Sequence, residues 1–337
     1  MSNITSPVIV GNNDFRFSAA AHWAQLPAGI GWRDVVAVSF ASNHNVYVNN
    51  RGDREMIYFD ADGNYLGDWG ETDFVRPHGL TISRADEVYC TDDFGHTVTR
   101  YDLHGQITQQ LGTRGVSSQT GAVDVDYRNI KHSAGPFNFP TNLAIADNGD
   151  LYITDGYGNA RVHQFSPSGK LLNSWGNPGS GPGEFHVPHD IRICDQGMIW
   201  VADRENDRIQ RFDPAGTYID SITDLARPAS LDFGREGEIY IFELGYQAGM
   251  FPGEVPPSDS ASGGRLTILD HNLNMVCRIG GGEKSGSAGD FYAPHNVRVD
   301  HQGNLYLAEV VWAAGGREGR APDGCSALQK LTRVIES

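Results

Sequence analysis

Hydrophobic and polar residues alternate along this chain in blocks that repeat six times. Each block contains a proline or its equivalent, an alternating apolar stretch, a short turn, and a second apolar stretch that ends in an acidic or amide residue. Alternation with a period of two is typical of short β-strands, and turns such as Asn148-Gly149 are typical of hairpins. The blocks begin at Val35, Pro77, Pro140, Pro188, Pro228 and Pro294.

A third strand, a second turn and a closing strand follow most of these hairpins. The closing strand often ends in Trp-Gly or Leu-Gly, as at Trp69-Gly70 and Leu111-Gly112. Four strands per unit, at a period of roughly 40 to 50 residues, are the signature of a propeller blade. The pattern therefore predicts an all-β chain, with a single domain over residues 1–337 that forms a six-bladed β-propeller.

The sixth block runs out of chain before its fourth strand. An open sheet edge would leave backbone groups unpaired, so another segment is expected to complete this blade. The segment from Phe15 to Trp23 has no partner in block one, and we predict that it closes the ring, with roughly residues 1–13 as an N-terminal tail. Three insertions break the period and are expected to be functional or solvated loops. They span residues 113–136, 247–264 and 313–325.

One position of the repeat carries histidine in alternate blocks. The residue after the initial proline is His78 in block two, His189 in block four and His295 in block six. If the blocks form a ring, the three imidazoles converge on its axis and form a metal site with an open position, which suits Zn²⁺ or another divalent transition metal. The alternative is that the histidines only line a water-filled channel. The other three blocks carry Val36, Thr141 and Ala229 at this position.

Two arginines and a tyrosine are expected near the same mouth of the ring. Arg51 and Arg204 directly follow the acidic or amide strand ends of blocks one and four, and arginine binds carboxylates through paired hydrogen bonds. Tyr157 lies between two glycines in block three, where we expect a catalytic base. Alternatively, the arginines pair with neighbours such as Asp53 and Glu205, and Tyr157 packs in a loop.

Composition limits the partners and the compartment. Among 337 residues, 39% are hydrophobic and 20% are charged, and the formal net charge is −16. An acidic chain repels phosphate backbones, so we expect no nucleic-acid partner. No apolar stretch is long enough for a membrane span and no secretory leader is evident, so no membrane association is expected. Four widely spaced cysteines form no metal or disulfide pattern, and we expect a cytoplasmic protein of open oligomeric state.

At these residues the chain resembles the peptidyl-α-hydroxyglycine α-amidating lyases, which are six-bladed propellers of the NHL-repeat kind. The resemblance extends over nearly all blocks. It implies that the three histidines bind catalytic zinc, that Arg51 and Arg204 are active-site arginines, and that Tyr157 is the catalytic tyrosine. The segments that carry it include Arg51-Gly52-Asp53, His78-Gly79-Leu80, Asp155-Gly156-Tyr157, Asp203-Arg204-Glu205 and Pro294-His295.

The resemblance also implies a structural Ca²⁺ in the channel. Its ligands would be the carbonyls of Val38 and Leu80 and the side chain of Asn296, where the family has an aspartate. A neutral amide brings less negative charge to Ca²⁺ than a carboxylate does.

The leading hypothesis is a zinc-dependent lyase that cleaves the C–N bond of an N-acyl carbinolamine, such as an α-hydroxyglycine derivative, to an amide and an aldehyde. The expected substrate is a small molecule that bears a carboxylate. The same residues would equally serve a metal-dependent hydrolase of a small amide, lactone or heterocyclic ring, in which a zinc-bound hydroxide attacks the carbonyl. A third alternative is a non-catalytic NHL-repeat scaffold that binds proteins, which gives no reason for histidines in alternate blocks.

Overall fold

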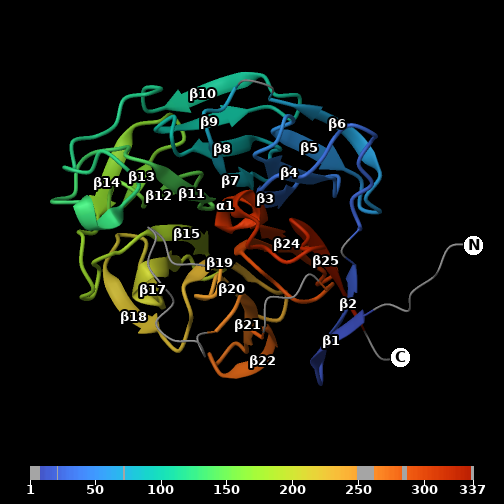
Figure 1. The fold of residues 1–337 in the computed structure, drawn as a ribbon. Coiled ribbons are helices and arrows are strands. Elements are labelled where there is room, and N and C mark those ends of the chain that lie inside the picture. The colour runs from blue at the N-terminus through green and yellow to red at the C-terminus, as the bar shows by residue number, and fades with distance from the viewer. Residues whose placement is uncertain (1–7, 21, 71–72, 249–261, 283–286, 335–337) are drawn as a thin grey trace, which may run out of the picture.

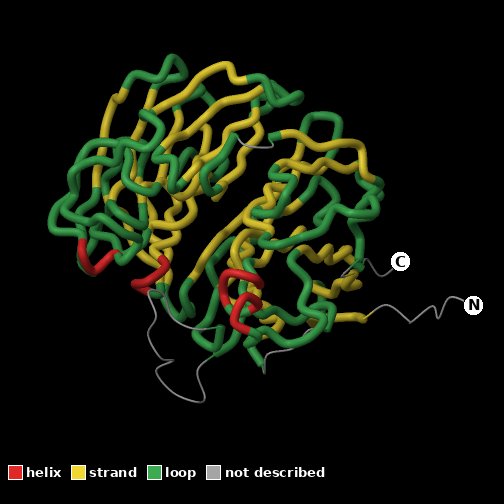
Figure 2. The backbone as a smooth tube through the Cα atoms, turned by 45° about the horizontal axis from the view of Figure 1, so that its top comes forward, coloured by secondary structure: helices red, strands yellow, loops and turns green. Residues whose placement is uncertain are grey.

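The computed structural model describes residues 8–20, 22–70, 73–248, 262–282 and 287–334. Strands within these residues form six antiparallel sheets, which are arranged around a central axis as the blades of a propeller (Figure 1). The tilted view shows strands around the whole ring, with the helical turns gathered on one face (Figure 2). The predicted all-β, six-bladed architecture is therefore confirmed.

Each of the first three blades contains four strands, numbered from the axis outward. Blade one consists of β3 (Val35–Phe40), β4 (Val46–Asn50), β5 (Met56–Phe59) and β6 (Tyr65–Trp69). Blade two consists of β7 (Pro77–Ile82), β8 (Val88–Asp92), β9 (Thr97–Tyr101) and β10 (Ile107–Leu111). Blade three consists of β11 (Pro140–Ile145), β12 (Leu151–Asp155), β13 (Arg161–Phe165) and β14 (Leu171–Trp175).

The last three blades continue the same order. Blade four consists of β15 (Pro188–Ile193), β16 (Ile199–Asp203), β17 (Arg208–Phe212) and β18 (Tyr218–Ile222). Blade five consists of β19 (Pro228–Phe233), β20 (Ile239–Glu243), β21 (Arg265–Leu269) and β22 (Met275–Gly280). Blade six consists of β23 (Pro294–Val299), β24 (Leu305–Glu309), β25 (Leu328–Arg333), β2 (Phe15–Ala20) and β1 (Val8–Asn12).

The N-terminal segment closes the ring, as predicted. Strand β2 pairs antiparallel with β25, with Phe17 opposite Arg333. Two boundaries differ from the prediction, because the closing strand ends at Ala20 and β1 lies inside the expected tail. A turn at Asn13, whose φ of 45° is tolerated by asparagine, folds β1 back onto β2 as a fifth strand. Residues 1–7 of the expected tail lie outside the described residues.

The helices are short connections. They are α1 (Val311–Ala314) and the 3₁₀ turns η1 (Tyr127–Asn129), η2 (Arg204–Asn206) and η3 (Gly316–Glu318). Within the described part of the chain, none of the helices has the length and apolar character that crossing a lipid bilayer requires.

The core consists of apolar layers between neighbouring blades. One layer packs Val48 and Phe59 of blade one against Tyr306 and Leu328 of blade six. Burial of such layers supplies most of the favourable free energy of folding, at roughly 25 cal/mol per Å² of apolar surface. Because each blade buries both faces against its neighbours, the ring holds the inner strands in fixed positions around the axis.

A β-bulge interrupts the inner strand of each described blade at the histidine position. In β7 the register shifts between Pro77 and Gly79, and in β15 it shifts between Pro188 and Asp190. The other inner strands shift at the equivalent residues. The extra residue has no cross-strand partner, and a bulge re-aims its side chain. The bulge therefore falls at the position that carries histidine in alternate blades, and the residue there is not paired across the strands.

The acidic or amide residue at the end of each second strand is a structural pin. Asp92 accepts backbone hydrogen bonds from Val75 and Arg76, at 2.6 and 2.9 Å. A buried carboxylate that accepts such bonds is stabilised by them and holds the donating loop in place. Each pin thus fixes the segment that leads into an inner strand. The equivalent residues, which make the same kind of bond, are Asn50, Asp155, Asp203, Glu243 and Glu309.

Candidate metal centre and active site

The three alternate-blade histidines meet on the axis of the ring. Their ring centroids are 4.7 to 4.8 Å apart in each pairing, which is close to an equilateral triangle. One ligand nitrogen from each of His78, His189 and His295 lies within 4.8 Å of the others, and all three side chains are buried. The structure thus brings together the residues that the repeat pattern predicted to converge.

The second ring nitrogen of each histidine fixes its orientation. Because a carbonyl oxygen only accepts, an Nδ1 that contacts one carries the proton and donates it, which leaves the lone pair on Nε2 for a ligand. The acceptors lie at the histidine position of the next blade, so alternate blades supply the imidazoles and the intervening blades orient them. Nδ1 lies 2.7 Å from the oxygen of Thr141 for His78, of Ala229 for His189 and of Val36 for His295.

Burial keeps the three imidazoles neutral. Desolvation lowers the pKa of His78, His189 and His295 well below the ordinary value, and positive charges nearby act in the same direction. Those charges include Arg204 beside His189 and Arg51 beside His295. A neutral imidazole with a free Nε2 is the form that binds a metal ion. The triad fits a divalent transition metal with nitrogen ligands.

Tyr157 lies directly over the triad. Its hydroxyl oxygen is 3.1 Å from Nε2 of both His78 and His189, and its ring is buried against Phe139 and Val187. The ring thus packs in a loop cluster, as the alternative expected, and the hydroxyl faces the histidines, where a catalytic group was expected. A single phenol proton can be donated to only one of the two nitrogens at a time.

The backbone of blade three explains how Tyr157 reaches this place. The Tyr157 N–H donates to the carbonyl of Phe139, the residue before the inner-strand proline. Arg51 and Arg204 make the same bond in blades one and four, so Tyr157 is their structural equivalent although it comes one residue later in its block. The extra residue is Gly156. The chain passes so close to the carbonyl oxygen of Pro188 there that a Cβ would lie 2.2 Å from it, so only glycine fits.

The two predicted arginines have different surroundings. Arg204 donates from Nη1 to the Tyr157 hydroxyl at 3.3 Å and from Nε to Glu205 at 2.7 Å. Arg51 donates from Nε to the carbonyl of Pro77 at 2.9 Å, and its Nη2 lies 3.8 Å from Asp93. The alternative pairing of Arg204 with Glu205 is therefore present. Arg51 lies beside Asp93 of the next blade instead of the expected Asp53.

Two further arginines belong to this mouth and were not predicted. Arg76 binds Asp93 through Nε and Nη2, at 2.8 and 2.5 Å, and Arg227 binds Glu205 at 2.8 Å. Both arginines directly precede the inner-strand residue of their blade, as Phe139 does in blade three. That shared position in the repeat is the sequence signal by which these two arginines could have been found. Their acids come from other blades or strands, so the pairing itself required the fold.

The mouth is cationic although the whole chain is acidic. Arg51 and Arg76 share Asp93, and burial together with the charge of Arg76 lowers the pKa of Arg51. Arg204 shares Glu205 with a second arginine in the same way. Each group of two guanidinium ions and one carboxylate carries a net positive charge, which Asp34 near Arg51 and Asp92 near Arg76 offset in part. Since fields are stronger where water is excluded, this arrangement favours an anionic ligand.

Two of the three residues expected to bind Ca²⁺ contact each other. Asn296 Oδ1 accepts the backbone N–H of Val38 at 3.0 Å, and its amide nitrogen donates to Ser230 at 3.2 Å. Leu80 is fully buried in an apolar cluster. Calcium takes six to eight oxygen ligands, usually with carboxylates among them. Asn296 brings no charge and its Oδ1 already accepts one hydrogen bond, which disfavours calcium, and the calcium site stays a prediction.

A small cavity lies between the histidines and the next residues of the inner strands. Its volume is about 10 Å³, which is room for one water-sized particle. Asp190 lines it, and its oxygens accept from the side chains of Asn142, Arg192 and Ser230 and from the backbone of Leu231. The cavity therefore separates the triad from a polar layer centred on Asp190. Its lining residues are Val36, His78, Asn142, His189, Asp190, Ala229, His295 and Asn296.

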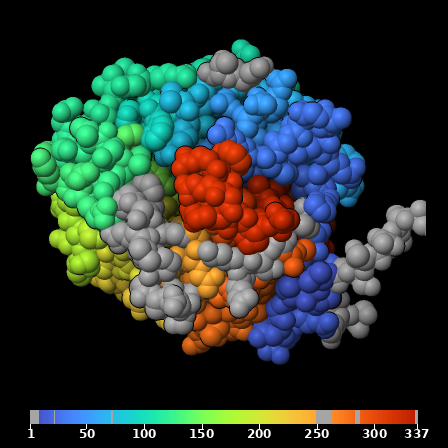
Figure 3. Space-filling view, in the orientation of Figure 1, coloured from blue at the N-terminus to red at the C-terminus, as the bar shows by residue number. Residues whose placement is uncertain are grey.

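Two of the three insertions lie at the mouth. In the first, 113–136, Val125 and Tyr127 pack against the apolar cluster that contains Tyr157. In the third, 313–325, the backbone N–H of Ala313 donates to Asp34 at 3.0 Å, in blade one. Figure 1 shows α1 over the centre of the ring, and Figure 3 shows the same C-terminal segment, in red, covering it. In the second, 247–264, residues 249–261 lie outside the described residues.

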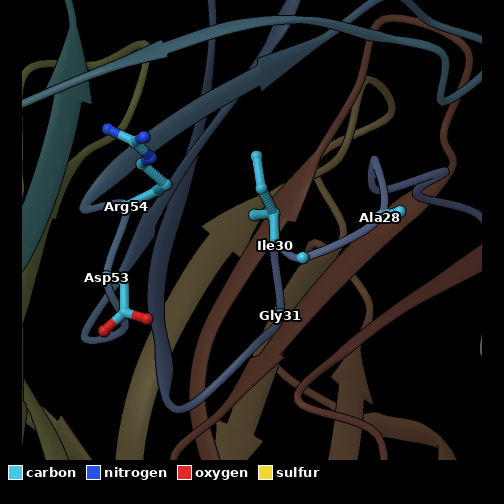
Figure 4. Close-up of a pocket in the computed structure, with 6 residues that line it drawn as sticks. Ala28, Ile30, Gly31, Asp53 and Arg54 are labelled. Carbon is cyan, nitrogen blue, oxygen red and sulfur yellow. The ribbon is translucent and has the colours of Figure 1, made fainter.

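A larger pocket on blade one lacks comparable chemistry. It has a volume of about 330 Å³, and its side chains include Ile30, Asp53 and Arg54 (Figure 4). Arg54 lies 3.6 Å from Asp68, and no histidine, cysteine or tyrosine lines the pocket. Size alone does not identify a reactive site, and the convergence of buried polar groups favours the triad.

Comparison with known proteins shows the family. A family profile described as a 6-bladed beta-propeller matches residues 136–244. Over 287 residues the chain is 30% identical to NHL repeat-containing protein 3 of Homo sapiens, with 80% of this chain and 74% of the human protein covered. The chain belongs to the family of NHL repeat-containing protein 3. Membership of this NHL-repeat family agrees with the six blades.

This member of the NHL repeat-containing protein 3 family is also related to amidating lyases. It is 35% identical over 161 residues to peptidyl-alpha-hydroxyglycine alpha-amidating lyase 1 of Drosophila melanogaster, which covers 45% of this chain. The chain spans only 28% of the length of the fly protein. The resemblance found in the sequence is thereby confirmed.

The fold is shared more widely than the sequence. A streptogramin B lyase structure superposes with a TM-score of 0.58, covering 94% of this chain and 97% of that protein, at 12% identity. At that identity the likeness establishes the propeller architecture alone. Function has to be argued from the site.

Proposed function

We propose that this protein is a zinc-dependent lyase of the amidating type, which cleaves the C–N bond of an N-acyl α-hydroxyglycine to an amide and glyoxylate. One observation carries the proposal: the Tyr157 hydroxyl lies 3.1 Å from two of three buried, orientationally fixed histidine nitrogens. The relation to a named α-hydroxyglycine lyase supports the substrate class. When bound, zinc supplies positive charge that acidifies a nearby hydroxyl group.

The chain's own residues supply the proton transfer. With a cation held by the three Nε2 atoms, Tyr157 would start as a phenolate whose own proton has gone to solvent. Its oxygen then takes the proton of the substrate hydroxyl, the C–O bond becomes a carbonyl, and the C–N bond breaks. The departing amide nitrogen takes a proton, which Tyr157 returns. Arg204 donates to the Tyr157 oxygen, and a guanidinium stabilises negative charge on an oxygen that accepts its hydrogen bond.

Arg51 is proposed to bind the substrate carboxylate. Its side chain is 13% exposed, compared with 5% for Arg204, and its Nη2 is 3.8 Å from Asp93, beyond a direct hydrogen bond. Arg51 thus keeps donors for a ligand, whereas Arg204 is committed to Tyr157 and Glu205. This division of roles supports a small-molecule substrate that bears a carboxylate.

Two other functions compete with the lyase. Tyr157 and Arg204 are donors that would also stabilise the oxyanion of a hydrolysed amide, lactone or ring carbonyl, which favours a metal-dependent hydrolase as the second candidate. A protein-binding scaffold of the NHL type is the third. It gives no role to three histidines whose Nδ1 atoms all donate to backbone carbonyls.

The deciding experiment has two stages. Elemental analysis of the full chain, expressed with metal supplied, should give close to one zinc or similar ion per chain. The loaded protein is then screened by mass detection against α-hydroxyglycine derivatives, lactones and cyclic amides. Release of glyoxylate supports the lyase, and ring opening with uptake of water supports the hydrolase instead. A chain that binds no metal overturns both enzyme proposals and leaves the scaffold.

A further inference from the structure

Arg204 is held by a buried carboxylate that a second buried arginine shares. Arg227 Nη2 donates to Glu205 Oε1 at 2.8 Å, and the same oxygen accepts from Arg204 Nε at 2.7 Å. Arg204 Nη1 then reaches the Tyr157 hydroxyl at 3.3 Å. A continuous chain of contacts therefore runs from Arg227 through Glu205 and Arg204 to the hydroxyl above the histidines.

This chain of contacts is secluded from water and rigidly held. The side chains of Arg227 and Glu205 are 1% and 2% exposed. Burial opposes ionisation of Glu205, but Arg204 and Arg227 outweigh it and hold the pKa of that carboxyl below its usual value. Arg227 has a φ of 53°, a conformation that residues other than glycine rarely adopt and that persists only where surrounding contacts maintain it.

Further bonds fix the Arg227 side chain and backbone. Nη1 donates to the carbonyl of Gly245 at 3.2 Å, Nε lies 3.2 Å from Glu205 Oε2, and the backbone N–H donates to Asp207 at 2.8 Å. A planar guanidinium held in this way fixes the orientation of the Glu205 carboxylate, because both carboxylate oxygens accept from it. The Glu205 carboxylate in turn fixes the orientation of the Arg204 guanidinium.

The other side of the mouth has the same parts in a looser form. Arg76 binds Asp93 through two nitrogens, at 2.8 and 2.5 Å, but Asp93 lies 3.8 Å from Arg51. Arg51 donates from Nε to the carbonyl of Pro77 at 2.9 Å, whereas Arg204 donates to the Tyr157 hydroxyl at 3.3 Å. The group around Glu205 therefore holds an arginine on Tyr157, whereas the group around Asp93 holds an arginine that is not hydrogen-bonded to its carboxylate.

We propose that Arg227 is a positioning residue, which acts through Glu205 to keep Arg204 on the Tyr157 hydroxyl, while Arg76 acts through Asp93 to place Arg51 for the substrate anion. The proposal rests on the proposed function. Loss of Arg227 lets Arg204 pair with both oxygens of Glu205 and leave Tyr157. Turnover and anion binding thus depend on different arginine pairs.

Kinetics of the metal-loaded full chain test this division, with N-benzoyl-α-hydroxyglycine as the probe. Arg227→Met should lower kcat by about 10- to 100-fold with KM within about twofold, because a misplaced group costs transition-state stabilisation and not substrate binding. Arg227→Lys keeps the charge and should recover part of kcat. Arg76→Met should raise KM by about tenfold or more with a smaller change in kcat.

The matched control is Arg265→Met. Arg265 binds the buried Glu243 at 2.8 Å, the same distance as between Arg227 and Glu205. Without Arg265, Glu243 keeps its bonds to the Thr267 hydroxyl and to the N–H of Ala226, so the segment that precedes Arg227 stays held. This variant should lose stability and keep kcat and KM. If Arg227→Met behaves like Arg265→Met, Arg227 is structural and the proposal is overturned. If Arg227→Met fails to fold, an unchanged kcat in Arg227→Lys overturns it.

A crystal structure of Arg227→Met separates this proposal from the proposed function. The distance from Arg204 Nη1 to the Tyr157 hydroxyl should increase from 3.3 Å to beyond hydrogen-bonding range. If Arg204 stays on Tyr157, the positioning role is wrong whatever the activity. If the metal-loaded wild type turns over no probe, the proposed function fails, and this distance still decides the role of Arg227.

Discussion

At the scale of single residues, the two nitrogens of each histidine have separate tasks. Nδ1 of His78, His189 and His295 donates to a backbone carbonyl, and Nε2 faces the axis. Second contacts of this kind set the tautomer and the direction of a ligand before any metal binds. A side chain that only lined a water-filled channel would not need the same fixed partner in three blades.

Replacement of His189 by alanine should remove most of the bound metal. Two imidazoles remain, which is one ligand fewer than a zinc site with an open position needs. The ring should still fold, with a loss of about 1–3 kcal/mol from the Ala229 carbonyl left without its donor. Elemental analysis measures the metal, with the exposed His104→Ala as the control that keeps it. Full metal content in His189→Ala would show that the three-histidine site is wrong.

Replacement of Tyr157 by phenylalanine isolates its hydroxyl. The ring keeps its packing against Phe139 and Val187, so folding and metal content should be unchanged. Turnover of an N-acyl α-hydroxyglycine should fall by roughly 10²- to 10⁴-fold, the usual contribution of a positioned acid or base. Steady-state kinetics at matched metal content provide the measurement. Wild-type turnover in this variant would assign Tyr157 to packing alone.

At the scale of elements, the inner strand and its pin form the working unit of each blade. The bulge turns one side chain toward the axis, and the carboxylate or amide at the end of the next strand holds the segment that precedes it. In blade six, Glu309 accepts backbone bonds from Tyr292 and Ala293, at 2.7 and 2.9 Å, just before Pro294. The same pin occurs in blades with and without histidine, so it belongs to the fold and not to the chemistry.

The blade-six pin should make stability depend on pH. Burial raises the pKa of Glu309 from 4.5 to about 7, so the folded protein holds more protons than the unfolded chain between these values. Its contribution to stability is therefore full below pH 4.5 and is lost as the pH rises through 7. Glu309→Gln removes this titration, so the variant should gain stability relative to wild type between pH 5 and pH 8. Urea unfolding at both values measures it, and an equal difference at both would contradict the assignment.

The closing strand should carry a large share of the stability of blade six. Phe17 on β2 is fully buried among side chains of blades five and six. Phe17→Ala should therefore lower the free energy of unfolding by about 3–5 kcal/mol. Val8→Ala on β1 is the control, because Val8 is 46% exposed and should cost about 0.5 kcal/mol or less. Equal losses in denaturant unfolding would mean that β2 does not close the ring in solution.

At the scale of the whole molecule, the ring concentrates positive charge where the chain as a whole is acidic. The formal net charge is −16, yet four arginines meet near the triad, where their side chains pair with Asp93 and Glu205. The overall charge governs solubility and disfavours nucleic acid, whereas the local charge governs what enters the mouth. Net charge alone therefore gave no indication of an anionic substrate.

Removal of metal ions should affect the molecule selectively. A calcium-selective chelator should leave Tm unchanged, because Asn296 is committed to Val38 and Ser230. A chelator that strips zinc should lower Tm, because an ion that binds only the native state stabilises it. Thermal unfolding at constant ionic strength measures both. A fall in Tm that calcium alone restores would establish a calcium site in spite of the asparagine.

The sequence by itself determined the repeat, the number of blades and the triad, because all three are periodic. Period-two alternation specifies strands, six blocks specify six blades, and a residue type that recurs at one position of alternate blocks must converge once the blocks form a ring. Ring closure by the segment containing Phe17 followed from the missing strand in block six. Tyr157, Arg51 and Arg204 were found because they lie beside a periodic position.

Only the tertiary structure decided how these residues act on one another. Asp93 reaches Arg51 from the next blade, and Glu205 reaches Arg227 from the preceding blade. The carbonyls that orient the histidines also come from other blades, and backbone carbonyls leave no mark in the sequence. Val8–Asn12 became a strand because a turn at Asn13 returned it to an open edge. Periodicity records what each blade repeats, whereas contacts between blades depend on distances that only the closed ring defines.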